Sequence, residues 1–198
     1  MARASIALNI PKCADYAQSR FVSLNYYVLR QNSRFFVCDI IWCRKVKPMW
    51  IYFDNCCLNR PFDELKTNIE HMECEAILTI LDMCDTIKNW NYLSSDVLLD
   101  EILETPDIIK REKLLLLLYS SFKHVNFTQA IYSRAKELEM FNIKSYDALH
   151  LASAEASKAD VLLTTDRRFL NSSAKANSFI PVKNPLKWLT EVLYDRKP

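Results

Sequence analysis

The stretch Met-Trp-Ile-Tyr-Phe-Asp at residues 49–54 decides the fold class of this chain. Five apolar or aromatic residues follow one another without interruption and end at Asp54. A short continuous apolar run of this kind is typical of a strand that is buried on both faces. The sequence therefore predicts a buried strand at Met49–Phe53 that is followed at once by a carboxylate.

Strand and helix patterns alternate after this first strand. The expected strands cover residues 90–94, 123–127 and 160–165. The expected helices cover residues 65–85, 95–104, 106–119, 128–141, 146–158 and 185–193. We expect Ser95, Thr128 and Ser145 to cap three of these helices. Such alternation predicts an α/β sandwich built around a parallel sheet.

Five consecutive leucines occupy residues 114–118. They are too closely spaced to share one helix face, so the simplest interpretation is a helix buried nearly all round. The alternative is that part of this helix forms a surface for a partner or a second copy.

The composition excludes several classes of phosphate-binding protein. The chain of 198 residues contains no glycine. The P-loop and the dinucleotide fingerprint need glycine for close approach of the backbone to a phosphate, and the G-x-S-x-G elbow needs it for a sharp turn. Any phosphate chemistry must therefore rely on side chains and metal.

Charge separates the chain into two parts. Residues 1–48 hold eight Lys or Arg and two Asp or Glu, whereas residues 49–198 hold eighteen and twenty-two. The first part is predicted to be a basic N-terminal extension, for which three interpretations are open: a weakly ordered arm, a transit segment, or translated sequence before the true start. We expect Met49 to begin the functional domain, whose acidic balance suits a site that holds a cation.

Cysteine usage points to a reducing compartment. The seven cysteines are odd in number and form no C-x-x-C pair, and the adjacent Cys56 and Cys57 suit neither a zinc site nor an easy disulfide. No apolar run reaches the ~20 residues that cross a membrane, and the start lacks a signal-peptide pattern. We therefore expect reduced thiols, a cytoplasmic location and no membrane partner.

Four carboxylates are the candidates for chemistry. Asp54 and Asp166 each follow a predicted strand, and parallel strands end at one edge of their sheet. Asp147 lies in the first turn of the helix at 146–158, and Glu101 lies on the helix at 95–104, each on an apolar face. Converging carboxylates repel one another and resist burial. Their convergence therefore predicts Mg²⁺ or Mn²⁺, which are bound by oxygen ligands.

Each candidate also has a simpler interpretation. Asp54 could close a strand as a turn residue, and Asp166 could be the N-cap of the following helix. Asp147 could be a first-turn carboxylate that the helix dipole favours, and Glu101 a solvated charge. His150 lies on an apolar helix, where a packed and hydrogen-bonded role is expected more often than a ligand role.

Four stretches together resemble the ordered motifs of the PIN-domain family, in a subgroup widespread in bacteria and especially in cyanobacteria. They are Asp54–Asp63, Ser94–Glu101, Tyr146–Ala152 and Leu163–Phe169. The resemblance covers about residues 49–190, and residues 1–48 have no counterpart in it. It implies a three-layer α/β/α sandwich with a central parallel sheet. It also implies a metal-dependent endoribonuclease, often the toxin of a toxin–antitoxin pair.

The resemblance also implies the site residues. The acidic set, both catalytic and metal-binding, would be Asp54, Glu101, Asp147 and Asp166. Asp100 competes with Glu101, because helical spacing lets only one of the two face inward, and motif alignment selects Glu101. Thr165 would add a hydroxyl near this set. Arg60, just beyond the first strand, is the candidate for contact with RNA phosphate.

The sequence thus leads to one principal hypothesis and two others. The first is a Mg²⁺- or Mn²⁺-dependent endoribonuclease with RNA as substrate and with an antitoxin and a homodimer as possible partners. The alternative is a non-catalytic RNA-binding or protein-interaction module that keeps the PIN fold. A metal-dependent phosphatase or DNA nuclease is the third, because the same carboxylates would serve it.

Overall fold

The computed structural model describes residues 48–86 and 89–195. Of the predicted extension, all but Pro48 lies outside the described residues. In the described part the strands form one sheet in the order β3-β2-β1-β4-β5, and every neighbouring pair is parallel. The strands are β1 Met49–Phe53, β2 Trp90–Ser95, β3 Lys123–Val125, β4 Val161–Leu163 and β5 Val182–Lys183.

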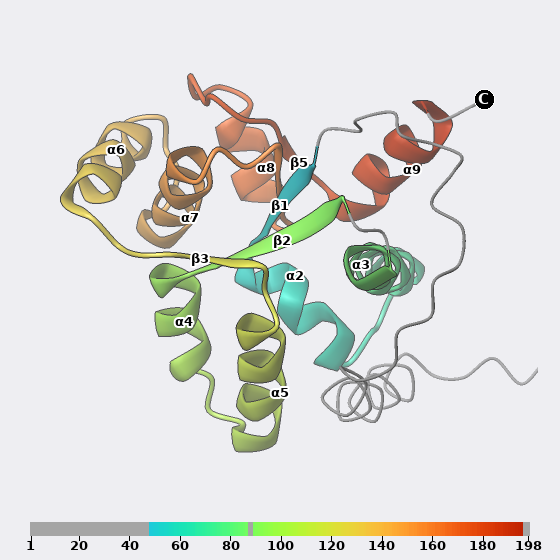
Figure 1. Ribbon diagram of the computed structural model, residues 1–198. Helices are drawn as coiled ribbons and strands as arrows, with labels where there is room; N and C mark the ends of the chain where they lie inside the picture. Colours follow the sequence, from blue (N-terminus) through green and yellow to red (C-terminus); the bar gives the residue numbers. More distant parts are fainter. Residues whose placement is uncertain (1–47, 87–88, 196–198) are drawn as a thin grey trace, which may run out of the picture. The chain divides into compact units, whose positions relative to one another are not determined.

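Helices cover both faces of this sheet (Figure 1). Those packed in one core are α3 Asn68–Thr86, α4 Asp96–Leu103, α5 Ile108–Tyr119 and α9 Pro185–Asp195, with the short α2 Asn55–Asn59 and the 3₁₀ turn η1 Arg60–Phe62 beside them. Those packed in the other core are α6 Gln129–Glu139, α7 Ser145–Ala156 and α8 Arg167–Ser173. The predicted three-layer α/β/α sandwich with a central parallel sheet is confirmed.

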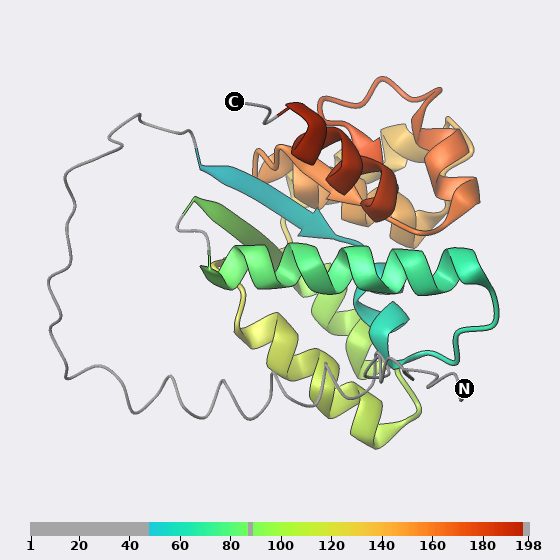
Figure 2. The same cartoon turned by 90° about the vertical axis from the view of Figure 1, so that its right-hand side faces the viewer.

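The central strand β1 contributes side chains to both hydrophobic cores, because successive side chains of a strand point to opposite faces of the sheet. Ile51 and Phe53 pack with α3 and α9, and Tyr52 packs with α7. Figure 2 shows α3 and α9 together in front of the sheet. Burial on both faces is the physical reason why β1 reads as a continuous apolar run rather than an alternating one.

Of the three predicted helix caps, two are confirmed and one is wrong. The side chains of Ser95 and Thr128 accept hydrogen bonds from backbone amides in the first turns of α4 and α6, as helix caps do. Ser145 is instead the first helical residue of α7, and Lys144 precedes it without a side-chain cap. The two-residue β5 and the short α2 were not predicted, because such short elements carry no period.

The leucine run of α5 has one buried face. Leu114 and Leu118 are buried at 0% and 2% exposure, whereas Leu116 is 50% exposed. The interpretation of a helix buried nearly all round is therefore wrong, since 3.6 residues per turn bring only every third or fourth leucine to the core. No helix among residues 48–86 and 89–195 is long and apolar enough to cross a membrane.

Candidate metal centre

Side chains with carboxylates gather at the edge of the sheet where the parallel strands end. Asp54 directly follows β1, and Asp166 lies three residues beyond β4. Glu101 comes from α4, which begins where β2 ends, and Asp147 comes from the first turn of α7. The topology thus brings together residues that lie more than a hundred positions apart in the chain.

Asp54 is the most firmly held carboxylate of the group. Its side chain is buried, and Oδ2 accepts hydrogen bonds from Thr164 Oγ1 at 2.7 Å and from Cys56 Sγ at 2.9 Å. Its backbone amide donates to the carbonyl of Leu163 at 2.9 Å, which ties it to the end of β4. Its position is therefore set by both central strands before any ligand binds.

Glu101 is positioned by His150. The imidazole Nε2 lies 2.8 Å from Glu101 Oε2 and 3.7 Å from Asp54 Oδ1. One ligand atom from each of these three side chains lies within 4.8 Å of the others. Asp100 has a different partner, since its Oδ2 accepts a hydrogen bond from the Tyr146 hydroxyl at 3.1 Å. The structure therefore turns Glu101, and not Asp100, toward Asp54.

His150 is itself fixed by a buried chain of hydrogen bonds. It is 1% exposed, its Nδ1 lies 2.9 Å from the Tyr52 hydroxyl, and that hydroxyl lies 2.6 Å from Ser95 Oγ. Burial acts to lower the pKa of His150, but Tyr52, the hydrogen bond to Glu101 and the charge of Asp54 outweigh it and raise the pKa above its ordinary value. A protonated imidazole would partly offset the charges of Asp54 and Glu101.

Asp147 is the carboxylate with the least compensation. Burial, followed by repulsion from Asp54 and Asp166, raises its pKa from 3.8 to about 6, although Lys144 acts in the opposite direction. Within residues 48–86 and 89–195, no group donates a hydrogen bond to this carboxylate. Asp147 is therefore a half-buried acceptor whose negative charge calls for a cation.

Asp166 caps a helix and also lies beside the other carboxylates. Its Oδ1 accepts from the backbone amides of Arg168 at 2.7 Å and Phe169 at 3.3 Å, so it caps α8. Its Oδ2 lies 3.3 Å from Lys144 Nζ. Burial alone would raise the pKa of Asp166, but these amides and Lys144 lower it below its ordinary value. The carboxylate stays ionised beside the group while it holds the helix.

The donor chemistry of this group fits a divalent cation. Asp54 and Glu101 each offer a carboxylate oxygen within 4.8 Å of the other and of His150, and Asp147 interacts electrostatically with both Asp54 and Asp166. Mg²⁺ and Mn²⁺ prefer oxygen ligands, and a cation would offset the negative charge of Asp147, whose pKa is raised first by burial and then by repulsion from Asp54 and Asp166.

Comparison with known proteins identifies the family of this chain. A family model for the PIN domain matches residues 64–174. The chain belongs to the PIN domain family. Among solved structures, the crystal structure of VapBC2 from Rickettsia felis bound to a DNA fragment from their promoter is similar with a TM-score of 0.49 and 15% identity. That similarity covers 69% of this chain and 98% of that chain. No curated protein matches the sequence.

Two residues expected near the site of this PIN domain lie differently. The guanidinium of Arg60 pairs with Glu70 at 3.7 Å and with Glu73 at 3.4 Å, so the structure directs it to α3 and not to the carboxylates. The hydroxyl bonded to Asp54 belongs to Thr164, whereas the backbone amide of Thr165 donates to Cys56 Sγ at 3.2 Å.

The residues that sequence reasoning missed are those that hold the carboxylates. His150 was expected to be packed and hydrogen-bonded, which it is, but its place between Asp54 and Glu101 was not foreseen. Its position three residues after Asp147, on one helix face, was the available signal. Thr164 and Cys56 gave none, because their contacts join segments about 110 residues apart.

Proposed function

We propose that this PIN domain is a Mg²⁺- or Mn²⁺-dependent endoribonuclease. The observation that carries the proposal is the convergence of Asp54, Glu101 and His150 within 4.8 Å beside an Asp147 whose pKa is raised to about 6. PIN domains are generally nucleases that cut phosphodiester bonds, and membership of the family supports the same reaction here.

Each side chain has a defined part in the proposed reaction. Asp54, Glu101, Asp147 and Asp166 hold the cation. When bound, a divalent cation supplies a water of lowered pKa and offsets negative charge on the phosphate. One carboxylate of the set also orients the attacking water as a general base. His150 keeps Glu101 oriented toward Asp54.

Lys144 is our candidate for contact with the substrate phosphate, in place of Arg60. It is the residue before α7, its side chain is 53% exposed, and its ammonium group lies 3.3 Å from Asp166 Oδ2. An ammonium group at the rim of an acidic group attracts a phosphate while the carboxylates hold the cation. Arg60 is committed to its ion pairs with Glu70 and Glu73.

The partner proteins are part of the same proposal. The motif resemblance favours a toxin that an antitoxin inhibits, acting as a homodimer. Large apolar side chains on and after α5 are exposed and available to a partner, with Ile109 at 68%, Tyr119 at 71% and Phe122 at 69%. We propose a cytoplasmic location, because Cys56 and Cys57 are free thiols in adjacent positions.

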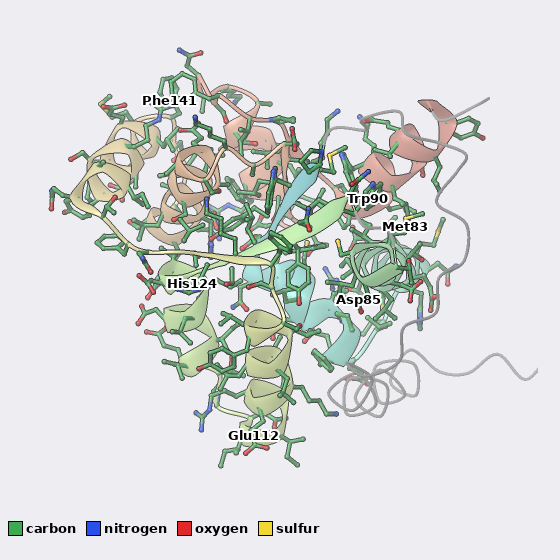
Figure 3. All side chains as sticks on the ribbon, in the orientation of Figure 1. Met83, Asp85, Trp90, Glu112, His124 and Phe141 are labelled. Atoms are coloured by element: carbon green, nitrogen blue, oxygen red, sulfur yellow. The ribbon has the colours of Figure 1, made fainter. Side chains whose placement is uncertain are left out.

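A substrate panel tests the proposed reaction. The full-length protein is incubated with single-stranded RNA, single-stranded DNA and a phosphomonoester, each with Mg²⁺, with Mn²⁺ or with a chelator. We expect cleavage of RNA only when metal is present. Asp54→Asn and Asp147→Asn should each lower the rate at least about 100-fold while folding is retained. Glu112→Gln, an exposed carboxylate on α5 (Figure 3), serves as the control and should keep the parent rate.

The other outcomes separate the competing hypotheses. Metal-dependent attack on DNA or on the phosphomonoester, but not on RNA, would replace the ribonuclease proposal with one of those classes. Binding of RNA by well-folded protein without cleavage under any condition would indicate a non-catalytic module. Equal activity in the parent and both Asn variants would indicate a contaminating nuclease or a different site.

A further inference from the structure

A pocket of about 320 Å³ adjoins the carboxylate group. Its lining residues are Asp96, Val97, Asp100, Phe127, Tyr146 and Leu149. They come from α4, from the segment after β3 and from α7, so the pocket lies where β2 and β3 end. In a parallel sheet this edge is where ligands bind.

The pocket and the carboxylate group share the boundary between α4 and α7. The hydrogen bond from Tyr146 to Asp100 joins these two helices at the pocket, and the hydrogen bond between His150 and Glu101 joins them at the site. Asp100 and Glu101 are consecutive residues of α4. A nucleotide chain whose phosphate lies at the carboxylates therefore has a neighbouring base within reach of the pocket.

The two carboxylates of the pocket are not equivalent. Asp96 is fully engaged, since Oδ1 lies 2.8 Å from His124 Nε2 and Oδ2 accepts the Phe127 amide at 2.6 Å. Figure 3 labels His124 beside α4. Asp100 is exposed, and Tyr146 bonds only its Oδ2, which leaves Oδ1 without a partner among the described residues. Asp96 thus holds the backbone of Phe127 in place at one side of the pocket. Asp100 Oδ1 remains able to accept a hydrogen bond from a ligand.

We propose that this pocket receives a guanine base of the RNA next to the cleaved phosphate, an inference that rests on the proposed ribonuclease function. Phe127 and Tyr146 are 47% and 37% exposed, and exposed aromatic side chains provide faces on which unpaired bases stack. Guanine presents an imino N–H and an amino group side by side, and a carboxylate accepts from both. Uracil presents a single N–H between two carbonyl oxygens, which Asp100 would repel.

Charge supports a base rather than a phosphate as the occupant. Two carboxylates line the pocket, and the pocket residues include no Lys or Arg. Phosphate would be repelled there, whereas the N1–H and amino donors of a guanine are accepted. The pocket therefore acts as a base reader beside a phosphate-cleaving site.

The test maps cut sites on an RNA of random sequence with the full-length protein and its preferred metal. The parent is expected to enrich guanine about tenfold at one position beside the cut. Asp100→Asn removes the negative charge and exchanges one acceptor oxygen for an amide donor, so it should weaken that enrichment. Phe127→Ala removes a stacking face and should weaken it. Glu104→Gln changes another exposed carboxylate close by, at the end of α4, and should leave the enrichment at the parent level. Inosine in place of the guanosine, which deletes only the amino group, should lower cleavage by the parent.

The outcomes distinguish the pocket from the nuclease. RNA cleavage with no base preference, or with a guanine preference unchanged in Asp100→Asn and Phe127→Ala, would overturn the base reader and leave the ribonuclease proposal intact. If the parent cuts no RNA, the ribonuclease proposal fails, and binding in chelator then decides the pocket. A guanosine oligonucleotide should bind about tenfold tighter than its inosine counterpart, and only when Asp100 is present. Equal binding would contradict the inference.

Discussion

At the scale of single residues, the carboxylates of the site are held by different means. Asp54 is fixed by Thr164 and Cys56, and Glu101 by His150. Asp147 accepts no hydrogen bond from the described residues, and the charges of Lys144 and His150 offset its own only in part. Removing a positioning group should therefore weaken cation binding by an amount that depends on which carboxylate it held.

His150→Leu should lower the affinity for Mn²⁺ about 10- to 100-fold. The substitution removes the hydrogen bond that orients Glu101 and leaves the buried Tyr52 hydroxyl with one partner fewer. Calorimetric titration of the full-length protein with Mn²⁺ measures the effect. His71→Leu, at an exposed position on α3, is the control and should bind like the parent. Unchanged affinity in His150→Leu would show that Glu101 does not depend on this contact.

Asp147 should make the metal-free protein lose stability as the pH rises from about 4 to about 6. The pKa of this carboxyl is raised from 3.8 to about 6 on folding, so the native state binds more protons in that window. The loss should be on the order of 1–3 kcal/mol, and it should level off above the window. Urea unfolding in chelator at a series of pH values measures it.

The control for this prediction is Asp147→Asn, which cannot ionise. Its free energy of unfolding should be less dependent on pH across the same window and higher than that of the parent at pH 7. A parent and a variant with parallel pH profiles would mean that Asp147 is not destabilised by its neighbours.

The acidic residues were the part of the site that the sequence could indicate. Their positions after strands and at helix starts follow from local pattern and from the common edge of a parallel sheet. The choice of Glu101 over Asp100, and of Thr164 over Thr165, depends on side-chain direction across tertiary contacts. The ion pair of Arg60 was not foreseen, because nothing local shows that Glu73, buried on α3, would pair with it.

At the scale of elements, a buried ion pair joins three segments on the α3 face of the sheet. Arg60 of η1 pairs with Glu73 of α3, and Asn184 before α9 donates to Glu73 Oε1 at 2.8 Å. The side chains of Arg60 and Glu73 are only 19% and 9% exposed. Replacing one partner of a buried ion pair strongly destabilises a protein, because the remaining charge is left without compensation.

Glu73→Leu should lower the free energy of unfolding by about 3 kcal/mol, because it leaves the Arg60 guanidinium poorly compensated. Chemical denaturation measures the change. Adding Arg60→Met to this variant should restore at least half of the loss, since both charges are then gone. Glu112→Leu, a surface substitution on α5, should change stability by less than about 0.5 kcal/mol. A double variant as unstable as Glu73→Leu would show that the loss does not come from the uncompensated charge of Arg60.

The elements that the sequence predicted well are long or strongly patterned. The strand at Met49–Phe53 has the same bounds in the structure, because an apolar run ending at a carboxylate leaves little choice of register. The sequence pattern defines the first residue of α7 less clearly. Ser145 was therefore predicted to be its cap, although it is the first residue of the helix. Neither β5 nor α2 is long enough to show a period.

At the scale of the whole molecule, the parallel sheet gathers negative charge at one edge of an already acidic body. Burial, together with repulsion from Asp54 and Asp166, raises the pKa of Asp147, so the metal-free native state carries an electrostatic cost. A ligand that binds only the native state stabilises it in proportion to RT ln(1 + [L]/Kd). Cation binding should therefore raise the free energy of unfolding of the whole domain.

Mg²⁺ or Mn²⁺ at about 100 times its Kd should raise the melting temperature of the full-length protein by roughly 5–10 °C. Thermal unfolding with and without metal measures the shift. Combining Asp54→Asn with Asp147→Asn should remove most of it, whereas Glu112→Gln should not. The same shift in the parent and in the combined variant would place the cation elsewhere.

The most direct test of the central claim is the rate at which one RNA is cut under single-turnover conditions as a function of Mg²⁺ concentration. The full-length parent and Asp54→Asn are compared. We expect no cleavage in chelator, a rate that rises and saturates with Mg²⁺, and a rate at least about 100-fold lower for Asp54→Asn at every concentration. Cleavage by the parent in chelator, or equal rates for the two proteins, would contradict the carboxylate-held cation as the source of activity.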